Sequence, residues 1–181
     1  MTEFPVRAVV FSLGSNVGDS DATLQRAVDA LAATPGLTLT GVSSVYLTDP
    51  VDKLDQPDFH NIVVVGTSSL APLKLLRRAH QIEDDEGRTR LVDKGPRTLD
   101  IDLIALDDLR CDTERLTVPH PRAHQRAFVL VPWIQLQPEA RLPQGSAADL
   151  LAQIGAHGVR RIGDRVRLHT TIGRTDPIEA V

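Results

Sequence analysis

Residues 98–106 read Thr-Leu-Asp-Ile-Asp-Leu-Ile-Ala-Leu, a stretch that begins with alternating apolar and acidic side chains. Successive side chains of a β-strand point to opposite faces of a sheet. Leu99, Ile101 and Leu103 therefore predict a face that packs into a core. Asp100 and Asp102 predict an acidic face on the other side, so this strand joins the core to a pair of carboxylates.

Upstream of this strand, strand and helix signals follow one another in an order that indicates the fold class. The predicted elements are a strand from Arg7 to Leu13 with a turn at Gly14, a helix with apolar Leu24 and Leu31 that Pro35-Gly36 ends, strands at about 37–47 and 59–69, and a helix from Pro72 to Gly87. With residues 98–106 added, the order predicts an α+β, ferredoxin-like sandwich. We expect an antiparallel sheet with helices packed on one face and a ligand cleft with mobile loops on the other.

Downstream of this strand, the signals are shorter. We expect a hairpin at about 109–118, a helix at about 123–131, another helix after Ser146 through Ile154 and a late strand at about 165–172. Residues 173–181 are expected to fray. No repeat or linker divides the chain, so residues 1–181 are predicted to form a single domain.

The composition limits the classes of protein to which the chain can belong. Of its 181 residues, 41% are hydrophobic and 24% are charged, the balance of a globular domain. The formal net charge of -4 predicts no affinity for nucleic acid, so a phosphate site needs a local basic cluster. Cys111 is the only cysteine, and no segment approaches the roughly 18 apolar residues of a membrane span. We expect a cytoplasmic monomer that binds small molecules and no membrane.

Asp100 and Asp102 are candidate metal ligands. Their positions along a strand lie about 7 Å apart on one face, which leaves room for a metal ion between them. Magnesium prefers oxygen ligands and is commonly held by one or two carboxylates plus substrate phosphates. The alternative is that they are two solvent-facing aspartates, because so short a motif often occurs by chance.

A basic segment precedes this carboxylate pair. Between Gly87 and Thr98 the charged residues are Arg88, Arg90, Asp93, Lys94 and Arg97. Arginine binds phosphate oxygens in pairs and stays charged, so the segment is a candidate phosphate clamp beside the metal. The alternative is a solvated loop paired with the acidic residues at 83–86.

A second cluster follows the predicted hairpin. His120 stands between two prolines, and Arg126 and Phe128 come shortly after it. Histidine and arginine can both donate hydrogen bonds to phosphate. Taken singly, however, a histidine between prolines is typical of a rigid turn and an arginine at a helix start is typical of the surface.

Four motifs occur in an order and spacing that resemble one known family. They are Leu13-Gly14-Ser15-Asn16, Asp55-Gln56-Pro57-Asp58-Phe59 with Asn61, Gly87-Arg88 followed by Gly95-Pro96-Arg97-Thr98-Leu99-Asp100-Ile101-Asp102, and Leu116-Thr117-Val118-Pro119-His120. From about Ala8 through Pro132 the chain resembles the 6-hydroxymethyl-7,8-dihydropterin pyrophosphokinase family. The resemblance implies a magnesium-dependent enzyme of folate biosynthesis that transfers pyrophosphate from ATP to the hydroxymethyl group of a reduced pterin, releasing AMP.

The resemblance also implies roles for particular residues. It assigns two magnesium ions to Asp100 and Asp102, which form the catalytic set with Arg88, Arg90 and Arg97. The residues that it implies for ATP are Glu83, Arg88, Arg90, Arg97, His120 and Arg126. Those that it implies for the pterin are Thr48, Val51, Phe59, Asn61 and Phe128, with the two aromatic rings on either side of the substrate.

The sequence departs from the family pattern at several positions. Lys94 stands where several members carry tryptophan, Pro121 replaces a tyrosine, and Phe59 keeps a ring where tyrosine can occur. The region after about Pro138 matches least well, and we assign it no catalytic role. Two other interpretations remain: another Asp-x-Asp metal-dependent transferase that uses a nucleotide, and a ferredoxin-like module that binds a small regulatory molecule.

Overall fold

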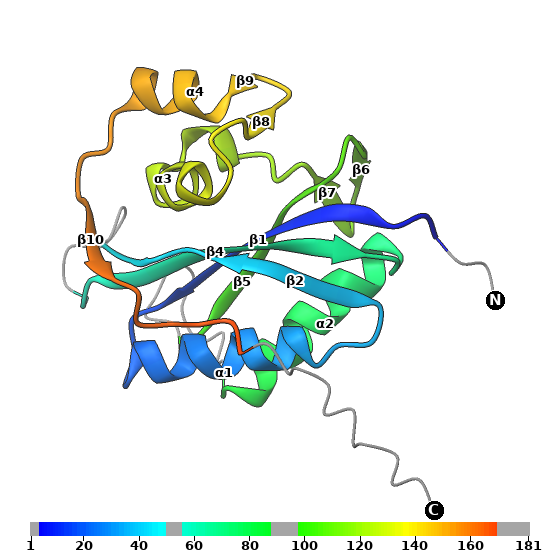
Figure 1. The fold of residues 1–181 in the computed structure, drawn as a ribbon, viewed down its shortest axis with the longest axis horizontal. Coiled ribbons are helices and arrows are strands. Elements are labelled where there is room, and N and C mark those ends of the chain that lie inside the picture. The colour runs from blue at the N-terminus through cyan, green and yellow to red at the C-terminus, as the bar shows by residue number, and fades with distance from the viewer. Residues whose placement is uncertain (1–3, 50–55, 88–97, 170–181) are drawn as a thin grey trace, which may run out of the picture.

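A computed structural model describes residues 4–49, 56–87 and 98–169 (Figure 1). The strands of the main sheet are β1 (Arg7–Ser15), β2 (Leu37–Val42), β3 (Val45–Thr48), β4 (Phe59–Ser68), β5 (Asp100–Leu106) and β10 (Val159–Gly163). The helices are α1 (Ser20–Ala32), α2 (Pro72–Asp85), the short 3-10 helix η1 (Ala123–Gln125), α3 (Ala127–Leu136) and α4 (Ala147–Ile154). Two small hairpins are formed by β6 (Cys111–Thr113) with β7 (Leu116–Val118) and by β8 (Arg141–Leu142) with β9 (Gly145–Ser146).

The main sheet brings together segments that are far apart in the sequence. Across the described residues it has six strands in the order β10, β3, β4, β1, β5, with β2 paired to the other half of β4. Every pair is antiparallel. Because β1 lies between β4 and β5, Gly14 is opposite Asn61 on one side and Asp100 on the other. The register therefore places Asn61 and Asp100, two of the predicted site residues, on either side of β1.

The strand that the sequence predicted at about 37–47 is divided into β2 and β3. Between them, the Ser43 N–H donates to the Val63 carbonyl, and the Ser43 hydroxyl accepts from the Val63 N–H, both at 2.9 Å. The same hydroxyl donates to the Ser44 carbonyl at 2.8 Å. Side-chain hydrogen bonds of this kind compete with the regular ladder, which explains the break at the two serines.

Helices α1 and α2 cover one face of the sheet, as the sequence predicted (Figure 1). Asp19 caps α1 by accepting a hydrogen bond from the Ala22 N–H, and Pro72 begins α2 at a position where its missing N–H has no helical partner. The apolar stripes of both helices are buried against β1 and β5, where Phe11 and Ile101 belong to the same core.

The opposite face of the sheet is partly covered by α3 and α4 (Figure 1). Val63 and Ile104 point to this side and form a second core with Val129, Leu130 and Trp133. The predicted helix at about 123–131 is thus a short 3-10 turn followed by a longer α3, which still contains Pro132. The ferredoxin-like α+β fold is confirmed, and the cleft face carries these two additional helices.

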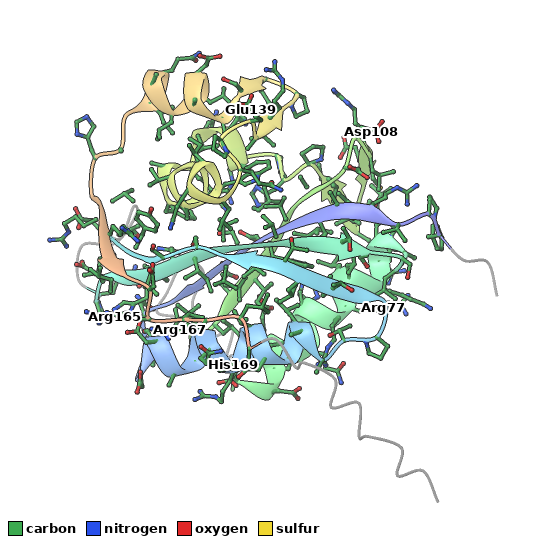
Figure 2. The ribbon with its side chains drawn as sticks, viewed as in Figure 1. Arg77, Asp108, Glu139, Arg165, Arg167 and His169 are labelled. Atoms are coloured by element: carbon green, nitrogen blue, oxygen red, sulfur yellow. The ribbon has the colours of Figure 1, made fainter. Side chains whose placement is uncertain are left out.

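The last strand lies earlier than the sequence predicted. It is β10, which pairs with β3, whereas the predicted strand at about 165–172 is absent from the part of it that the structure describes, residues 165–169. These residues run beside α1 instead, where Figure 2 shows Arg165, Arg167 and His169. The Gln25 side chain donates to the Arg167 carbonyl at 2.8 Å and accepts from its N–H at 2.9 Å. A side-chain amide from α1 therefore takes the place of a neighbouring strand.

Parts of the predictions lie outside the described residues. These parts are the frayed segment 173–181, the whole of the loop predicted to be mobile at Arg88 to Arg97, and residues 50–55 of the loop predicted to be mobile at Asp49 to Asp58. None of the helices in the described ranges is long and apolar enough to cross a membrane.

Candidate active site

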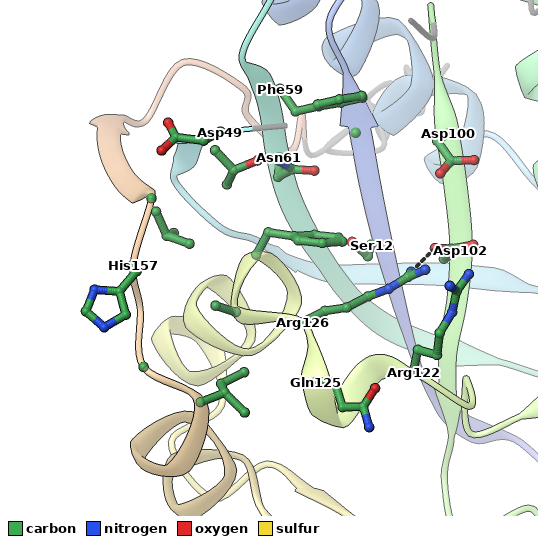
Figure 3. Close-up of a pocket in the computed structure, with 18 of the residues that line it drawn as sticks. Ser12, Asp49, Phe59, Asn61, Asp100, Asp102, Arg122, Gln125, Arg126 and His157 are labelled. Atoms are coloured by element: carbon green, nitrogen blue, oxygen red, sulfur yellow. Dashed lines mark hydrogen bonds and ion pairs between the residues drawn. The ribbon is translucent and has the colours of Figure 1, made fainter. Parts of the chain in front are cut away.

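A cavity of about 670 Å³ opens on the sheet face that carries α3 and α4 (Figure 3). Its walls come from β1, β3, β4 and β5, from the start of α3, and from the connection between α4 and β10. This volume is within the range of roughly 300–1,000 Å³ that is usual for small-molecule sites.

The acidic wall of the cavity is the strand with which the sequence analysis began. Asp100 and Asp102 line the cavity from β5, whereas Ile101 and Leu103 are only 3% and 4% exposed and point into the opposite core. The predicted alternation is therefore confirmed. Carboxylate oxygens on one exposed strand face are suitable ligands for magnesium.

Arginine side chains face these carboxylates. Arg126 Nη1 lies 2.8 Å from Asp102 Oδ2, and Arg122 extends toward the same carboxylate (Figure 3). The Arg126 guanidinium also lies over the Phe128 ring, 5.4 Å from its centre. Arg126 thus connects the acidic wall with an aromatic side chain of the cavity.

His120 lies beside this ion pair. Its Nε2 is 3.5 Å from Arg126 Nη1 and 3.8 Å from Asp102 Oδ2, and its Nδ1 accepts a hydrogen bond from the Arg122 N–H at 3.1 Å. Burial lowers the pKa of His120, nearby Asp102 works against this shift, and Arg126 and Arg122 add to it.

The other side of the cavity carries four of the five residues predicted for the pterin. They are Thr48, Phe59, Asn61 and Phe128. Asn61 Nδ2 donates to Thr48 Oγ1 at 2.7 Å, and both side chains are buried. This bond fixes the orientation of the Asn61 amide.

Gly14 leaves room for the amide of Asn61. A Cβ atom at position 14 would lie 2.8 Å from Asn61 Oδ1, closer than real Cβ atoms approach other groups. Because the β1–β4 register places these residues opposite each other, any larger side chain at 14 would push the amide out of place. This contact gives a direct steric reason for glycine at position 14 of the Leu13-Gly14-Ser15-Asn16 motif.

Glu83 lies apart from the cavity. It is 1% exposed on α2, and its Oε1 accepts a hydrogen bond from the Ile101 N–H at 2.7 Å. Ile101 lies between the two aspartates on the outer edge strand of the sheet. The structure thus gives Glu83 a contact with the backbone of the acidic strand, and its predicted contact with ATP stays a prediction.

The remaining predicted residues cannot be placed. Arg88, Arg90 and Arg97, together with Lys94 and Val51, lie outside the described residues. Their assigned roles stay predictions.

The sequence analysis missed one wall of the cavity. The end of α4 and the connection that leads to β10 line it through Ile154, Gly155, His157 and Gly158, in a region to which no role was assigned. Asp49 and Gln56 line it as well. Two of these residues are glycines with positive φ, at 75° and 71°, and glycine in a turn carries no signal for a ligand site. The packing of α4 against α3 and the pairing of β10 with β3 bring this segment to the cavity.

Paired carboxylates that face arginines, beside a polar and aromatic subsite, define a class of protein. They are the arrangement expected of an enzyme that transfers a phosphate-containing group from a nucleotide to a second small molecule. Comparison with known proteins names the family more closely. The sequence model of the 7,8-dihydro-6-hydroxymethylpterin-pyrophosphokinase family matches residues 10–138.

Individual proteins agree with this match. A 2-amino-4-hydroxy-6-hydroxymethyldihydropteridine pyrophosphokinase of Pseudomonas aeruginosa is 40% identical over 158 residues, covering 87% of this chain and 98% of the relative. A protein of the same name from Bacillus subtilis is 46% identical over 125 residues, covering 69% and 75% of the two chains. The chain belongs to the 7,8-dihydro-6-hydroxymethylpterin-pyrophosphokinase family.

Solved structures support the fold. A HPPK-DHPS structure from Plasmodium falciparum superposes with a TM-score of 0.68 at 14% sequence identity, covering 89% of this chain. This chain spans only 48% of that longer protein. At this level of identity the similarity concerns the fold alone.

Proposed function

We propose that the cavity transfers pyrophosphate from ATP to the hydroxymethyl group of 6-hydroxymethyl-7,8-dihydropterin, releasing AMP, as a step of folate biosynthesis. The observation that carries this proposal is that the Asp100–Asp102 pair and the Thr48–Asn61 pair line one cavity in a chain of this family. The first pair suits a metal and phosphates, and the second suits a flat ring with a hydrogen-bonding edge.

The pterin subsite is built around the fixed amide of Asn61. With one N–H committed to Thr48, the amide offers its oxygen and its second N–H to a ligand edge. Phe59 and Phe128 supply aromatic surface in the same cavity, which suits stacking on the two faces of a pterin. The donor and acceptor pattern together with these rings favours a flat heterocycle over a sugar.

The donor set of the acidic wall fits magnesium. Asp100 and Asp102 would hold it, and no cluster of three or more metal-binding side chains occurs among the described residues. Such a site takes its remaining ligands from water and phosphate oxygens, which is usual for magnesium bound with a nucleotide. When bound, the two ions proposed here would neutralise charge on the phosphates during transfer.

The cationic residues would hold the phosphates in place. Arg126 is near enough to Asp102 to share the phosphates with the metal site, and His120 lies beside it with Nε2 3.5 Å from Arg126 Nη1. Arg88, Arg90 and Arg97 are proposed to add charge from the preceding segment. The chemistry needs no strong general base, because transfer through a loose transition state gains most from positioning and charge neutralisation.

The proposal is tested by measuring AMP formed from ATP and magnesium, with and without 6-hydroxymethyl-7,8-dihydropterin. Asp100→Asn and Asp102→Asn should lower pterin-dependent AMP release by about a hundredfold or more, because each removes charge from the metal site. Asp108→Asn is the matched control, since Asp108 is exposed and lies away from the cavity (Figure 2). Folded protein that releases no AMP in the presence of the pterin would contradict the proposal. The cytoplasmic location and the monomeric state stay predictions.

A further inference from the structure

Strand β10 approaches the pterin subsite from outside the region that the family model matches. Val159 is opposite Thr48 and Arg160 is opposite Leu47 in the β10–β3 pair. The family match ends at residue 138. The strand therefore lies next to a predicted substrate-binding residue without belonging to the shared motifs.

Arg160 contacts two carboxylates that flank a point where two strands separate. Its Nη2 lies 2.8 Å from Asp58 Oδ2 and 3.6 Å from Asp49 Oδ1. The last pair of the β3–β4 ladder is Thr48 with Phe59, so Asp49 and Asp58 are the next residues on the two strands. Two like charges at such a position repel each other, and a cation between them removes the repulsion.

The backbone of the same region makes a second connection. The Asp49 N–H donates to the Gly158 carbonyl at 3.2 Å. Gly158 has a φ of 71°, and a Cβ atom there would lie 2.9 Å from Asp49 Oδ2. The positive φ favours glycine at this position, and the turn before β10 lies close against the Asp49 side chain. Asp49 and His157 are seen on this side of the cavity in Figure 3.

These contacts act on residues that line the cavity. Thr48 directly precedes Asp49, and Phe59 directly follows Asp58. Thr48 also accepts the hydrogen bond that orients Asn61. Any change in the separation of Asp49 and Asp58 therefore also moves the neighbouring Thr48 hydroxyl and Phe59 ring, on which the pterin subsite is built.

We propose that Arg160 is a positioning residue for the pterin, which acts through Asp49 and Asp58 and does not itself touch the substrate. This inference rests on the proposed function, because it concerns the same subsite. Arg160 does not line the cavity. Its effect is on substrate affinity, since the acidic wall that binds metal and phosphate lies on β5, at the far edge of the sheet from β10.

The next residue supplies a matched control. Arg161 is exposed like Arg160 and belongs to the same strand, but it donates to Ser44 Oγ at 2.7 Å and to Asp164 at 3.1 Å. These partners lie away from Asp49 and Asp58. Arg161→Gln removes the same charge from β10 and leaves the Arg160 contacts intact.

The experiment compares Arg160→Gln, Arg161→Gln and wild type by steady-state kinetics in each substrate and by direct binding of the pterin. Arg160→Gln should raise KM for the pterin about three- to tenfold, the effect that one or two exposed ion pairs can have. KM for ATP and kcat at saturating pterin should stay within about twofold of wild type, as should all constants of Arg161→Gln.

A variant with exchanged charges distinguishes loss of the Arg160 ion pairs from a general structural effect of the substitution. The double variant Arg160→Asp with Asp58→Arg restores a cation next to Asp49, so it should recover pterin affinity relative to Arg160→Asp alone. An unchanged KM for the pterin in Arg160→Gln would overturn the inference, as would an equal rise in both KM values or the absence of rescue. Failure of the proposed function is a different result, because wild type itself would then release no pterin-dependent AMP.

Discussion

The guanidinium of Arg126, the residue just before α3, lies 2.8 Å from the carboxylate of Asp102, so it neutralises one of the two predicted metal ligands. The side chains of this pair are 20% and 31% exposed, which places them at the edge of the cavity rather than in bulk solvent. If this carboxylate holds magnesium as proposed, the metal ion and the arginine would compete for it until a phosphate group of the nucleotide binds the arginine.

Replacing Arg126 by Met should tighten the binding of a divalent cation to the nucleotide-free protein. The expected gain is roughly three- to tenfold, because the pair is partly exposed and partly screened. It can be measured by titration with Mn²⁺, followed by electron paramagnetic resonance. ATP binding should weaken in the same variant. Arg126→Lys, which keeps the charge, is the control, and weaker Mn²⁺ binding in Arg126→Met would contradict the competition.

Replacing Thr48 by Val should weaken pterin binding by roughly tenfold and leave ATP binding unchanged. The substitution keeps the shape of the side chain but removes the oxygen that accepts the Asn61 N–H at 2.7 Å. The buried amide then loses its fixed orientation, and the protein should lose about 1–3 kcal/mol of stability. Thr48→Ser keeps the hydroxyl and should bind the pterin almost as wild type does. Isothermal titration calorimetry measures both affinities, and equal pterin affinity in the two variants would rule this role out.

Replacing Glu83 by Ala should lower the free energy of unfolding by about 1–3 kcal/mol, because it removes the acceptor for the buried Ile101 N–H. Glu83→Gln retains an oxygen at this position and should lose less. Denaturant unfolding monitored by circular dichroism provides the comparison. If Glu83→Gln instead has wild-type stability but binds ATP much more weakly, then the nucleotide contact predicted from the sequence is its main role.

Replacing Asp164 by Asn should destabilise the protein at neutral pH and have less effect in acid. Hydrogen bonds from Ser44 and Arg161 lower the pKa of Asp164 from its ordinary value of 3.8. The unfolded chain therefore binds the proton more readily. The stabilisation is fully present above pH 3.8 and is lost as the pH falls through the lowered pKa. Urea unfolding from pH 7 to pH 3 should show the difference from wild type shrinking in acid. A difference that does not depend on pH would contradict this account.

Short-range sequence patterns predicted those helices and strands whose formation depends on neighbouring residues in the chain. The alternation at 98–106 predicted both faces of β5, and helical spacing together with capping residues predicted α1 and α2. The break between β2 and β3 was missed because it depends on Ser43 bonding to Val63, a residue of another strand. The strand predicted at about 165–172 was misplaced because alternation alone cannot distinguish a sheet neighbour from the side of a helix.

Site residues could be predicted from the sequence where the side chain itself has a chemical group that suits a ligand. Asp100, Asp102 and Arg126 have side chains suited to metals or phosphate, whereas Asn61 was suggested by the family resemblance; all four line one cavity. Gly155 and Gly158 line the cavity through their backbone, so their residue type gave no such signal. Their place depends on β10 returning to β3, a contact between parts of the chain that are more than a hundred residues apart.

The wall formed by residues 154–159 has a consequence for inhibitor design. A compound confined to the space between Phe59, Asn61 and the two aspartates would contact only residues inside the family-matched region, 10–138. A compound extended toward Gly158 would also contact backbone from outside that region. Its selectivity among related enzymes would then depend on the turn before β10, where a drug-resistance substitution could arise without altering a single catalytic side chain.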